Sequence, residues 1–152
     1  MDDSVSDDLL STDGIIFDCD GVLIDITKSY DLTIDKTVKY VLENFSQITN
    51  CIEINSKIID GFKSSGGFND EVDLAYAAIL SLVAAKKLNK SQHEFIFDVI
   101  SNADSSGILS IEKYLEKFVD ISDIKNKLSY PGTHHDNSLY KIFDQIFYGP
   151  EL

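Results

Sequence analysis

Two aspartates spaced one residue apart follow a short apolar run near the start of the sequence. The run Gly14-Ile15-Ile16-Phe17 leads into Asp18-Cys19-Asp20-Gly21. In an extended backbone, residues i and i+2 project to the same side, so Asp18 and Asp20 can converge just beyond the carboxyl end of a strand. Two carboxylates this close repel each other unless a cation lies between them or one of them holds a proton. The spacing therefore predicts a catalytic or metal-binding strand end.

The oxygen ligands of this pair suit a hard cation. Mg²⁺ keeps several waters and takes one or two carboxylates together with the phosphate oxygens of a substrate. A carboxylate can also attack phosphorus, giving an aspartyl-phosphate that water then hydrolyses. Asp20 is placed to protonate the leaving oxygen and then to accept a proton from the attacking water. The residues predict Mg²⁺ as the cofactor and phosphoryl transfer as the reaction.

The stretch from Phe17 to Asp25 resembles the first motif of the haloacid dehalogenase superfamily of hydrolases. The resemblance implies that Asp18 is the nucleophile and a metal ligand. It also implies that Asp20 is the general acid/base and that its backbone carbonyl binds magnesium. The second acid is present in the phosphatases of that family and absent from its dehalogenases, which favours a phosphatase. The alternative for the same residues is a buried strand that ends in a solvated turn.

Composition and charge restrict the choice of partners. The 152 residues include 43% apolar residues and fit one domain of ordinary size, or one domain with an inserted subdomain. The net charge of −13 opposes binding to nucleic acid and to anionic membranes. All 13 basic residues are lysines, so no arginine can hold a substrate phosphate through two parallel hydrogen bonds. The expected partner is a small phosphorylated metabolite, and sugar phosphates, phosphoglycolate and amino-alcohol phosphates all remain candidates.

Compartment and membrane signals favour a cytoplasmic protein. Cys19 and Cys51 are too few for a disulfide framework. Residues 1–13 are acidic and polar, which is typical of a disordered tail and unlike a signal peptide. The most apolar segment, 74–85, is shorter than the roughly 18 to 20 residues that span a bilayer. We expect this segment to be a core helix.

Apolar residues recur at helical spacing in six segments. The predicted helices are 27–45, 53–62, 70–87, 91–100, 111–118 and 139–147. Thr27 or Ser29 is the predicted N-cap of the first helix, and Asn69 that of the third. Ser91 and Glu94 form a capping box before the fourth. The chain is therefore predicted to be predominantly α-helical.

The glycine pair between the second and third helices is a second candidate site. Gly66 and Gly67 lie before a helix N-terminus, where backbone amides can face an anion, although a simple loop between helices is the alternative. One subgroup of the same superfamily carries a similar lysine, Gly-Gly-Phe-Asn and acidic run in its cap. The resemblance thus places Lys63, Gly66, Gly67 and Asn69 near the substrate.

Residues 102–113 resemble a calcium loop superficially. Oxygen-bearing residues stand at positions one, three and five, and Gly107 stands at position six. Position twelve is Lys113 instead of the bidentate glutamate, and Glu112 comes one residue early. We therefore prefer a turn between helices and keep a calcium-responsive protein as an alternative.

The superfamily resemblance implies a haloacid-dehalogenase-like α/β fold of which this chain carries only part. The segments are a tail (1–13), the first strand of a Rossmann-like sheet with the aspartate motif (14–26), a helical C1-type cap (27–129), and a linker with a helix returning to the core (130–152). The later strands of such a sheet, with their phosphate-binding and metal-binding residues, are not recognisable in this sequence.

Two interpretations follow from this partial match. The first is a phosphatase that is inactive until the remaining strands are supplied, by self-association or by a complementing C-terminal segment. The second is a non-catalytic helical metal-binding or interaction protein derived from such an enzyme.

Overall fold

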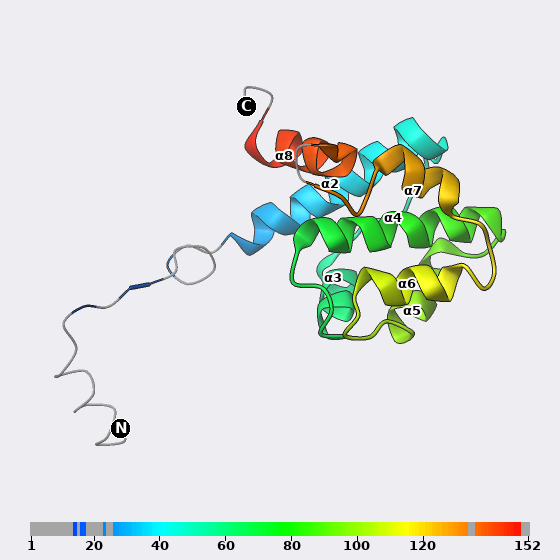
Figure 1. Cartoon of the computed structure of the whole chain (residues 1–152), viewed down its shortest axis with the longest axis horizontal. Helices are drawn as coiled ribbons and strands as arrows, with labels where there is room; N and C mark the ends of the chain where they lie inside the picture. The colour runs from blue at the N-terminus through cyan, green and yellow to red at the C-terminus, as the bar shows by residue number, and fades with distance from the viewer. Residues whose placement is uncertain (1–13, 15, 18–22, 24–25, 134–135, 150–152) are drawn as a thin grey trace, which may run out of the picture.

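The computed structural model describes residues 14, 16, 17, 23, 26–133 and 136–149, and this part of the chain is helical (Figure 1). Its helices are α2 (Thr27–Ser46), α3 (Ser56–Lys63), α4 (Glu71–Lys87), α5 (Gln92–Ser101), α6 (Ile108–Leu115), α7 (Ser122–Leu128) and α8 (Ser138–Tyr148). No described residue belongs to a strand. The prediction of a predominantly helical chain is therefore confirmed for the described residues.

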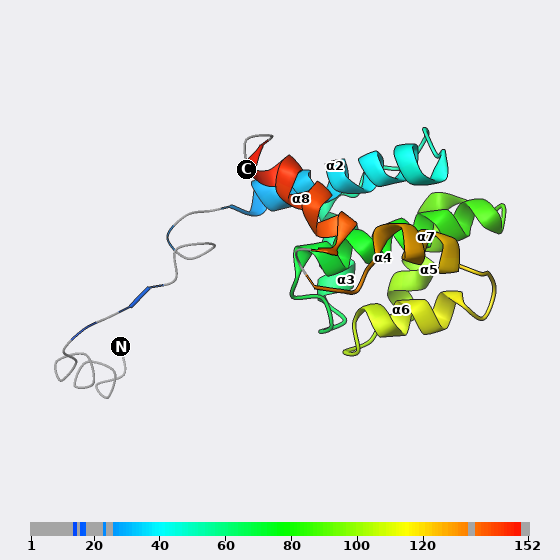
Figure 2. The same cartoon turned by 45° about the horizontal axis from the view of Figure 1, so that its top comes forward.

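Helix α4 is the centre of the packing. Figures 1 and 2 show α2 and α8 along one side of α4, and α5 and α6 along the other. Residues 74–85 of α4 are buried on every face of the helix, which confirms the expected core helix. Alanines at five of these positions let neighbouring helices approach closely, while Leu80 and Ile79 fill the space between them.

Helix α8 belongs to the same core. Leu139 and Phe143 project from one face of α8 and are buried, and the helix contacts both α2 and α4. Asn137 caps α8, because its side-chain oxygen accepts a hydrogen bond of 2.9 Å from the amide of Leu139. The end of α8 consequently lies beside the start of α2, where the rings of Tyr30 and Phe147 stack at 4.6 Å.

The helix starts correct two of the predicted caps. Helix α2 begins at Thr27 after Ile26, which makes no capping bond, so neither Thr27 nor Ser29 is the N-cap. Helix α4 is capped by Asp70, whose side chain accepts a 2.7 Å hydrogen bond from Val72, one residue later than the predicted Asn69. The predicted Ser91 cap of α5 is confirmed.

Two helices in the C-terminal half of the chain, α6 and α7, also differ from the predicted helices. Helix α7 was not predicted from apolar periodicity. It has seven residues, and only Ile124 and Leu128 are buried, while its other side chains are polar. Helix α6 ends at Leu115, before Phe118, whose side chain is half exposed. Short helices of this kind form through tertiary packing more than through their own periodicity.

The predicted strand over 14–26 is not observed at the positions that the structure describes. Gly14, Ile16, Phe17, Leu23 and Ile26 are outside regular secondary structure, and Ile16 is fully exposed. A strand needs a neighbour to pair its backbone groups, and the described residues supply none. The tail 1–13 lies outside the described residues. None of the described helices has the length and apolar character needed to cross a membrane.

Candidate functional site

The predicted catalytic residues Asp18 and Asp20 lie outside the described residues. The closest described helix is α2, which begins at Thr27, seven residues after Asp20. The first turns of α2 therefore mark the side of the helical body from which the chain continues to the two acids. The apolar side chains that flank the motif are uncovered, since Phe17 and Leu23 are both more than half exposed.

Lys63 lies near this side of the helical body. It ends α3, and its ammonium nitrogen is 3.5 Å from a carboxylate oxygen of Glu71 in the first turn of α4. Partial burial raises the pKa of Asp31 in α2, and the positive charge of Lys63 opposes that shift. The structure thus brings Lys63 close to the start of both α2 and α4.

The two predicted glycines have conformational reasons for their identity. Gly66 has a φ of +80°, a backbone conformation that L side chains rarely adopt, and its amide donates to the carbonyl of Lys63 at 3.0 Å. Gly67 lies directly against the backbone of Gly107, so the loop before α4 and the loop before α6 are in close contact. Both glycines shape the loop that carries Lys63 and Asn69.

We expect Gly67→Ala to lower the free energy of unfolding by about 1–3 kcal/mol, because the added Cβ collides with backbone atoms that have little freedom to move. The new carbon would overlap the amide nitrogen of Gly107 and would lie 2.5 Å from the carbonyl oxygen of Asp104. Urea unfolding followed by circular dichroism measures the change. Gly14→Ala is the control, since nothing lies within 4 Å of its Cβ position. Equal stability of the two variants would contradict the close contact.

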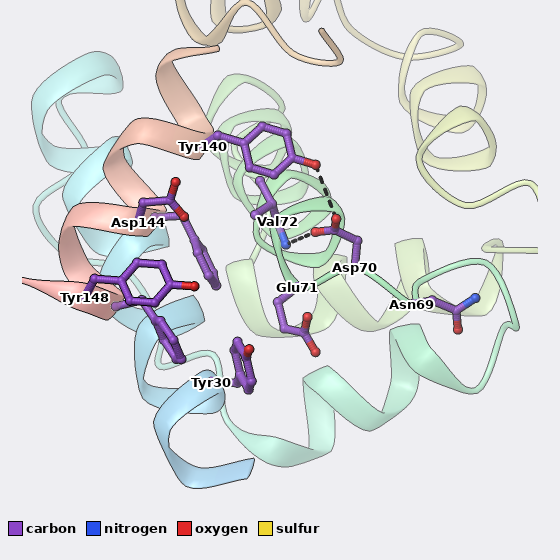
Figure 3. A pocket seen from close by; sticks show the side chains of 10 residues that line it. Tyr30, Asn69, Asp70, Glu71, Val72, Tyr140, Asp144 and Tyr148 are labelled. Atoms are coloured by element: carbon purple, nitrogen blue, oxygen red, sulfur yellow. Dashed lines mark hydrogen bonds between the residues drawn. The ribbon is translucent and has the colours of Figure 1, made fainter. Parts of the chain in front are cut away.

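Asn69 is exposed and does not take part in the capping of α4. It is one of the residues that line a cleft beside α2, and Figure 3 shows its side chain pointing away from the tyrosines of that cleft. Asn69 therefore does not cap α4 as the sequence predicted, because Asp70 caps the helix instead. Of the four residues placed near the substrate by resemblance, Lys63 and Asn69 carry the side-chain functional groups.

A cleft of about 330 Å³ opens between the start of α2, the start of α4 and the outer face of α8 (Figure 3). Its polar lining residues are Tyr30, Asn69, Asp70, Glu71, Tyr140, Asp144 and Tyr148, so the predicted substrate residue Asn69 belongs to the lining. The apolar ring of Phe147 lies between two of the tyrosines, stacked on Tyr30 and edge-on to Tyr148 at 4.9 Å. The cleft is thus walled by aromatic rings and edged by carboxylates.

Hydrogen bonds fix one side of this cleft. The hydroxyl of Tyr140 donates to Asp70 at 3.2 Å, and the hydroxyl of Tyr130 donates to Asp73 one turn further along α4. Burial raises the pKa of Tyr140, and the negative charge of Asp70 adds to that effect. Burial likewise raises the pKa of Asp73, although the hydrogen bond from Tyr130 opposes it. The tyrosines therefore stay neutral donors that hold the acids in place.

This cleft is not among the sites predicted from the sequence. No functional role was predicted for Asp70, Glu71 or Asp73, or for the polar residues of α8. A signal was present, because Tyr140, Asp144 and Tyr148 recur at a spacing of four and so share one face of a helix. That polar stripe runs beside the apolar stripe that packs α8 on α2.

The loop that resembles a calcium site is closed by its own hydrogen bonds. One carboxylate oxygen of Asp104 accepts bonds from the amide and the hydroxyl of Ser106, and these bonds lower the pKa of Asp104. Gly107 ends the turn with a φ of +61°, and α6 begins at the next residue. Across the described part of the chain, no three His, Cys, Asp or Glu side chains are grouped so that they could hold a metal ion. The turn between helices is sufficient to explain this loop.

No family model, curated protein or solved structure matches this chain. The function is therefore inferred from the chemistry of the Asp18–Asp20 segment and from the geometry of the described helices.

Proposed function

We propose that this chain carries the nucleophile segment and the helical cap of a Mg²⁺-dependent phosphomonoester hydrolase that acts on a small phosphorylated metabolite. The observation that carries the proposal is the motif Asp18-Cys19-Asp20-Gly21, with its apolar run before it and Val22-Leu23 after it. It is supported by the position of Lys63, which pairs with Glu71 at the start of α4 and acts on the pKa of Asp31 near the start of α2.

Each residue of the motif has a defined task in this proposal. The carboxylate of Asp18 attacks the phosphorus, the bond from phosphorus to the ester oxygen breaks, and an aspartyl-phosphate forms. Asp20 gives a proton to the departing alkoxide, then takes a proton from the water that attacks the aspartyl-phosphate. That second attack breaks the bond between Asp18 and phosphorus and releases inorganic phosphate. The residues are regenerated in their starting forms.

The donor set at this motif fits magnesium. Asp18 and Asp20 offer only oxygen ligands, and substrate phosphate oxygens would complete the set. Bound there, Mg²⁺ would offset the negative charge that gathers on the phosphoryl oxygens during transfer. Lys63 adds a positive charge on the cap side, which matters in a chain with no arginine.

We also propose that strands from outside this sequence complete the active site. This proposal is supported by the exposure of Ile16, Phe17 and Leu23, three apolar residues around the motif that the described helices do not cover. Strands from a longer chain, from a complementing segment or from a second copy would bury them and pair their backbone groups.

Phosphate release by the complete protein tests the proposal. The complete protein is this chain together with the longer chain, complementing segment or second copy that supplies the missing strands. With p-nitrophenyl phosphate and small metabolite phosphates, we expect turnover that requires Mg²⁺ and stops when EDTA is added. The 152-residue chain alone is expected to give no turnover. If the complete protein hydrolyses none of these esters in Mg²⁺, the proposed function is wrong.

The non-catalytic alternative is supported by the same exposed side chains, because apolar surface around the motif also suits a stable protein partner. The two proposals differ in the need for Asp18. A protein that binds its partner equally well with Asp18→Asn and hydrolyses no ester would be an interaction protein.

A further inference from the structure

The aromatic and acidic cleft beside α2 has the composition of a site for a positively charged organic group. Among the described residues, the charged side chains that line the cleft are Asp70, Glu71 and Asp144, and all three are acidic. Lys63 offsets the charge of Glu71 across 3.5 Å but does not line the cleft. The electrostatic potential in the cleft is therefore expected to be negative, which disfavours a phosphate or carboxylate group there.

The rings provide the second half of such a site. Tyr30 and Phe147 stack nearly parallel, with 14° between their planes, and Tyr148 meets Phe147 edge-on. Tyr148 is 63% exposed, so much of its ring faces solvent at the mouth of the cleft. A cation that rests against aromatic faces is attracted by the negative charge density of the rings, and quaternary ammonium groups are commonly bound in this way.

The cleft includes a residue that lies close in sequence to the proposed catalytic segment. Tyr30 follows Asp20 by ten residues and lies in the first turn of α2, the part of the helical body nearest to the motif in sequence. Figure 3 shows Tyr30, Glu71 and Tyr148 around one opening, with contributions from α2, α4 and α8. The volume of about 330 Å³ is enough for the organic part of a small metabolite.

We propose that this cleft binds an organic ammonium group, and that the alcohol part of the substrate therefore carries a positive charge. This inference rests on the proposed phosphatase function for its biological meaning, but the binding of the ammonium group is a property of the described helices alone. The rings of Tyr30 and Tyr148 contact the substituents on nitrogen, Phe147 packs against both of these rings, and Glu71 and Asp144 balance the charge of the ammonium group.

Binding of choline to the 152-residue chain tests the inference directly. Its neutral isostere 3,3-dimethylbutan-1-ol has the same shape with carbon in place of the charged nitrogen. We expect chemical-shift changes in α2, α4 and α8 on titration with choline, and affinity at least about fivefold higher than for the isostere. Equal affinity for the two compounds, or shifts that map away from these helices, would overturn the inference.

Matched variants separate a local site from the general attraction of a chain with a net charge of −13. Asp144→Asn and Tyr148→Leu should each weaken choline binding by about threefold or more, through loss of a charge and of a ring face. Glu43→Gln removes the same charge from an exposed position near the far end of α2, about 20 Å along the helix from Tyr30. An equal effect of Glu43→Gln and Asp144→Asn would show non-specific attraction and overturn the inference.

Hydrolysis by the complete protein distinguishes failure of this inference from failure of the proposed function. Phosphocholine and the phosphate ester of 3,3-dimethylbutan-1-ol present the same phosphate with and without the positive charge. We expect a higher kcat/KM for phosphocholine. Turnover of both esters without preference would overturn the inference and leave the phosphatase proposal standing. Selective choline binding without any hydrolysis would overturn the phosphatase proposal and leave the ammonium site standing.

Discussion

Asp18→Asn is expected to lower phosphate release by the complete protein by at least about 10⁴-fold, because the neutral amide has the shape of the carboxylate but cannot attack phosphorus. Asp20→Asn should reduce turnover by about 10²–10⁴-fold, the usual contribution of a general acid/base. The measurement is the initial rate with p-nitrophenyl phosphate and with an alkyl phosphate in Mg²⁺.

The two variants should also differ in kind. Asp20 protonates the leaving oxygen, and p-nitrophenolate leaves readily without a proton, so formation of the aspartyl-phosphate should be affected less with this substrate than with an alkyl phosphate. Hydrolysis of the intermediate still needs the base. We therefore expect Asp20→Asn to accumulate protein that carries one phosphoryl group in its intact mass, and expect Asp18→Asn to accumulate none.

The control for both variants is Asp123→Asn. Asp123 is exposed in α7 and forms only a surface ion pair of 2.9 Å with Lys127, so its loss should leave activity and stability nearly unchanged. Retention of most activity by Asp18→Asn, with normal activity in Asp123→Asn, would exclude Asp18 as the nucleophile. The motif would then need a different chemical explanation.

The long helices were predictable because their apolar residues repeat over many turns. The core segment 74–85 was recognisable from its composition alone, and α4 does run through the centre of the structure. The Ser91 cap was also predictable, since a capping residue acts on amides only three positions away. Local patterns of this kind carry their information within one stretch of sequence.

The errors arose where the outcome depends on distant residues. Asn69 and Asp70 are both good capping residues, and Asp70 performs the role in a structure where its other oxygen accepts from Tyr140, 70 residues away. The cleft was missed for the same reason, because Tyr30, Glu71 and Asp144 are brought together by the packing of α2, α4 and α8 on one another. The contact of Gly67 with the backbone of Gly107 is another long-range feature, which local sequence patterns do not reveal.

A buried charged network joins the middle helices. The hydroxyl of Tyr76 in α4 donates to Glu112 in α6 at 2.7 Å, and the other carboxylate oxygen of Glu112 is 2.8 Å from the ammonium nitrogen of Lys125 in α7. Lys125 also lies 3.3 Å from Glu116, which is more exposed. Lys125 is the one positive charge that both carboxylates share in this network, so its loss should be costly for the buried Glu112.

Lys125→Met is expected to lower the free energy of unfolding by about 3 kcal/mol, because it leaves the carboxylate of Glu112 buried without its countercharge. Urea unfolding at neutral pH measures the loss. In a Glu112→Gln background the only carboxylate left without Lys125 is the exposed Glu116, and the same Lys125→Met change should cost less than about 1 kcal/mol. An equal cost in both backgrounds would show that Lys125 acts through its aliphatic chain instead of its charge.

Lys127→Met is the matched control, since Lys127 lies two residues later in α7, pairs with an exposed aspartate and donates an exposed hydrogen bond of 3.2 Å to the carbonyl of Phe45. Surface pairs of this kind contribute about 0–1 kcal/mol. A loss of stability in Lys127→Met as large as in Lys125→Met would point to the helix propensity or packing of α7, and would remove the reason to assign the effect to Glu112.

The pH dependence gives a second readout of the same pair. Burial lowers the pKa of Lys125, but the hydrogen bonds and charges of Glu112 and Glu116 together raise it by more, so its pKa in the folded protein lies above its ordinary value. A raised lysine pKa stabilises the fold fully below the unfolded value of about 10.4, and this contribution is lost as pH rises through the folded pKa. The stability difference between wild type and Lys125→Met should therefore be constant from about pH 6 to pH 9 and shrink above about pH 10.4. Tyr76, whose pKa burial also raises, is present in both proteins, so its own loss of stability at high pH largely cancels in the difference.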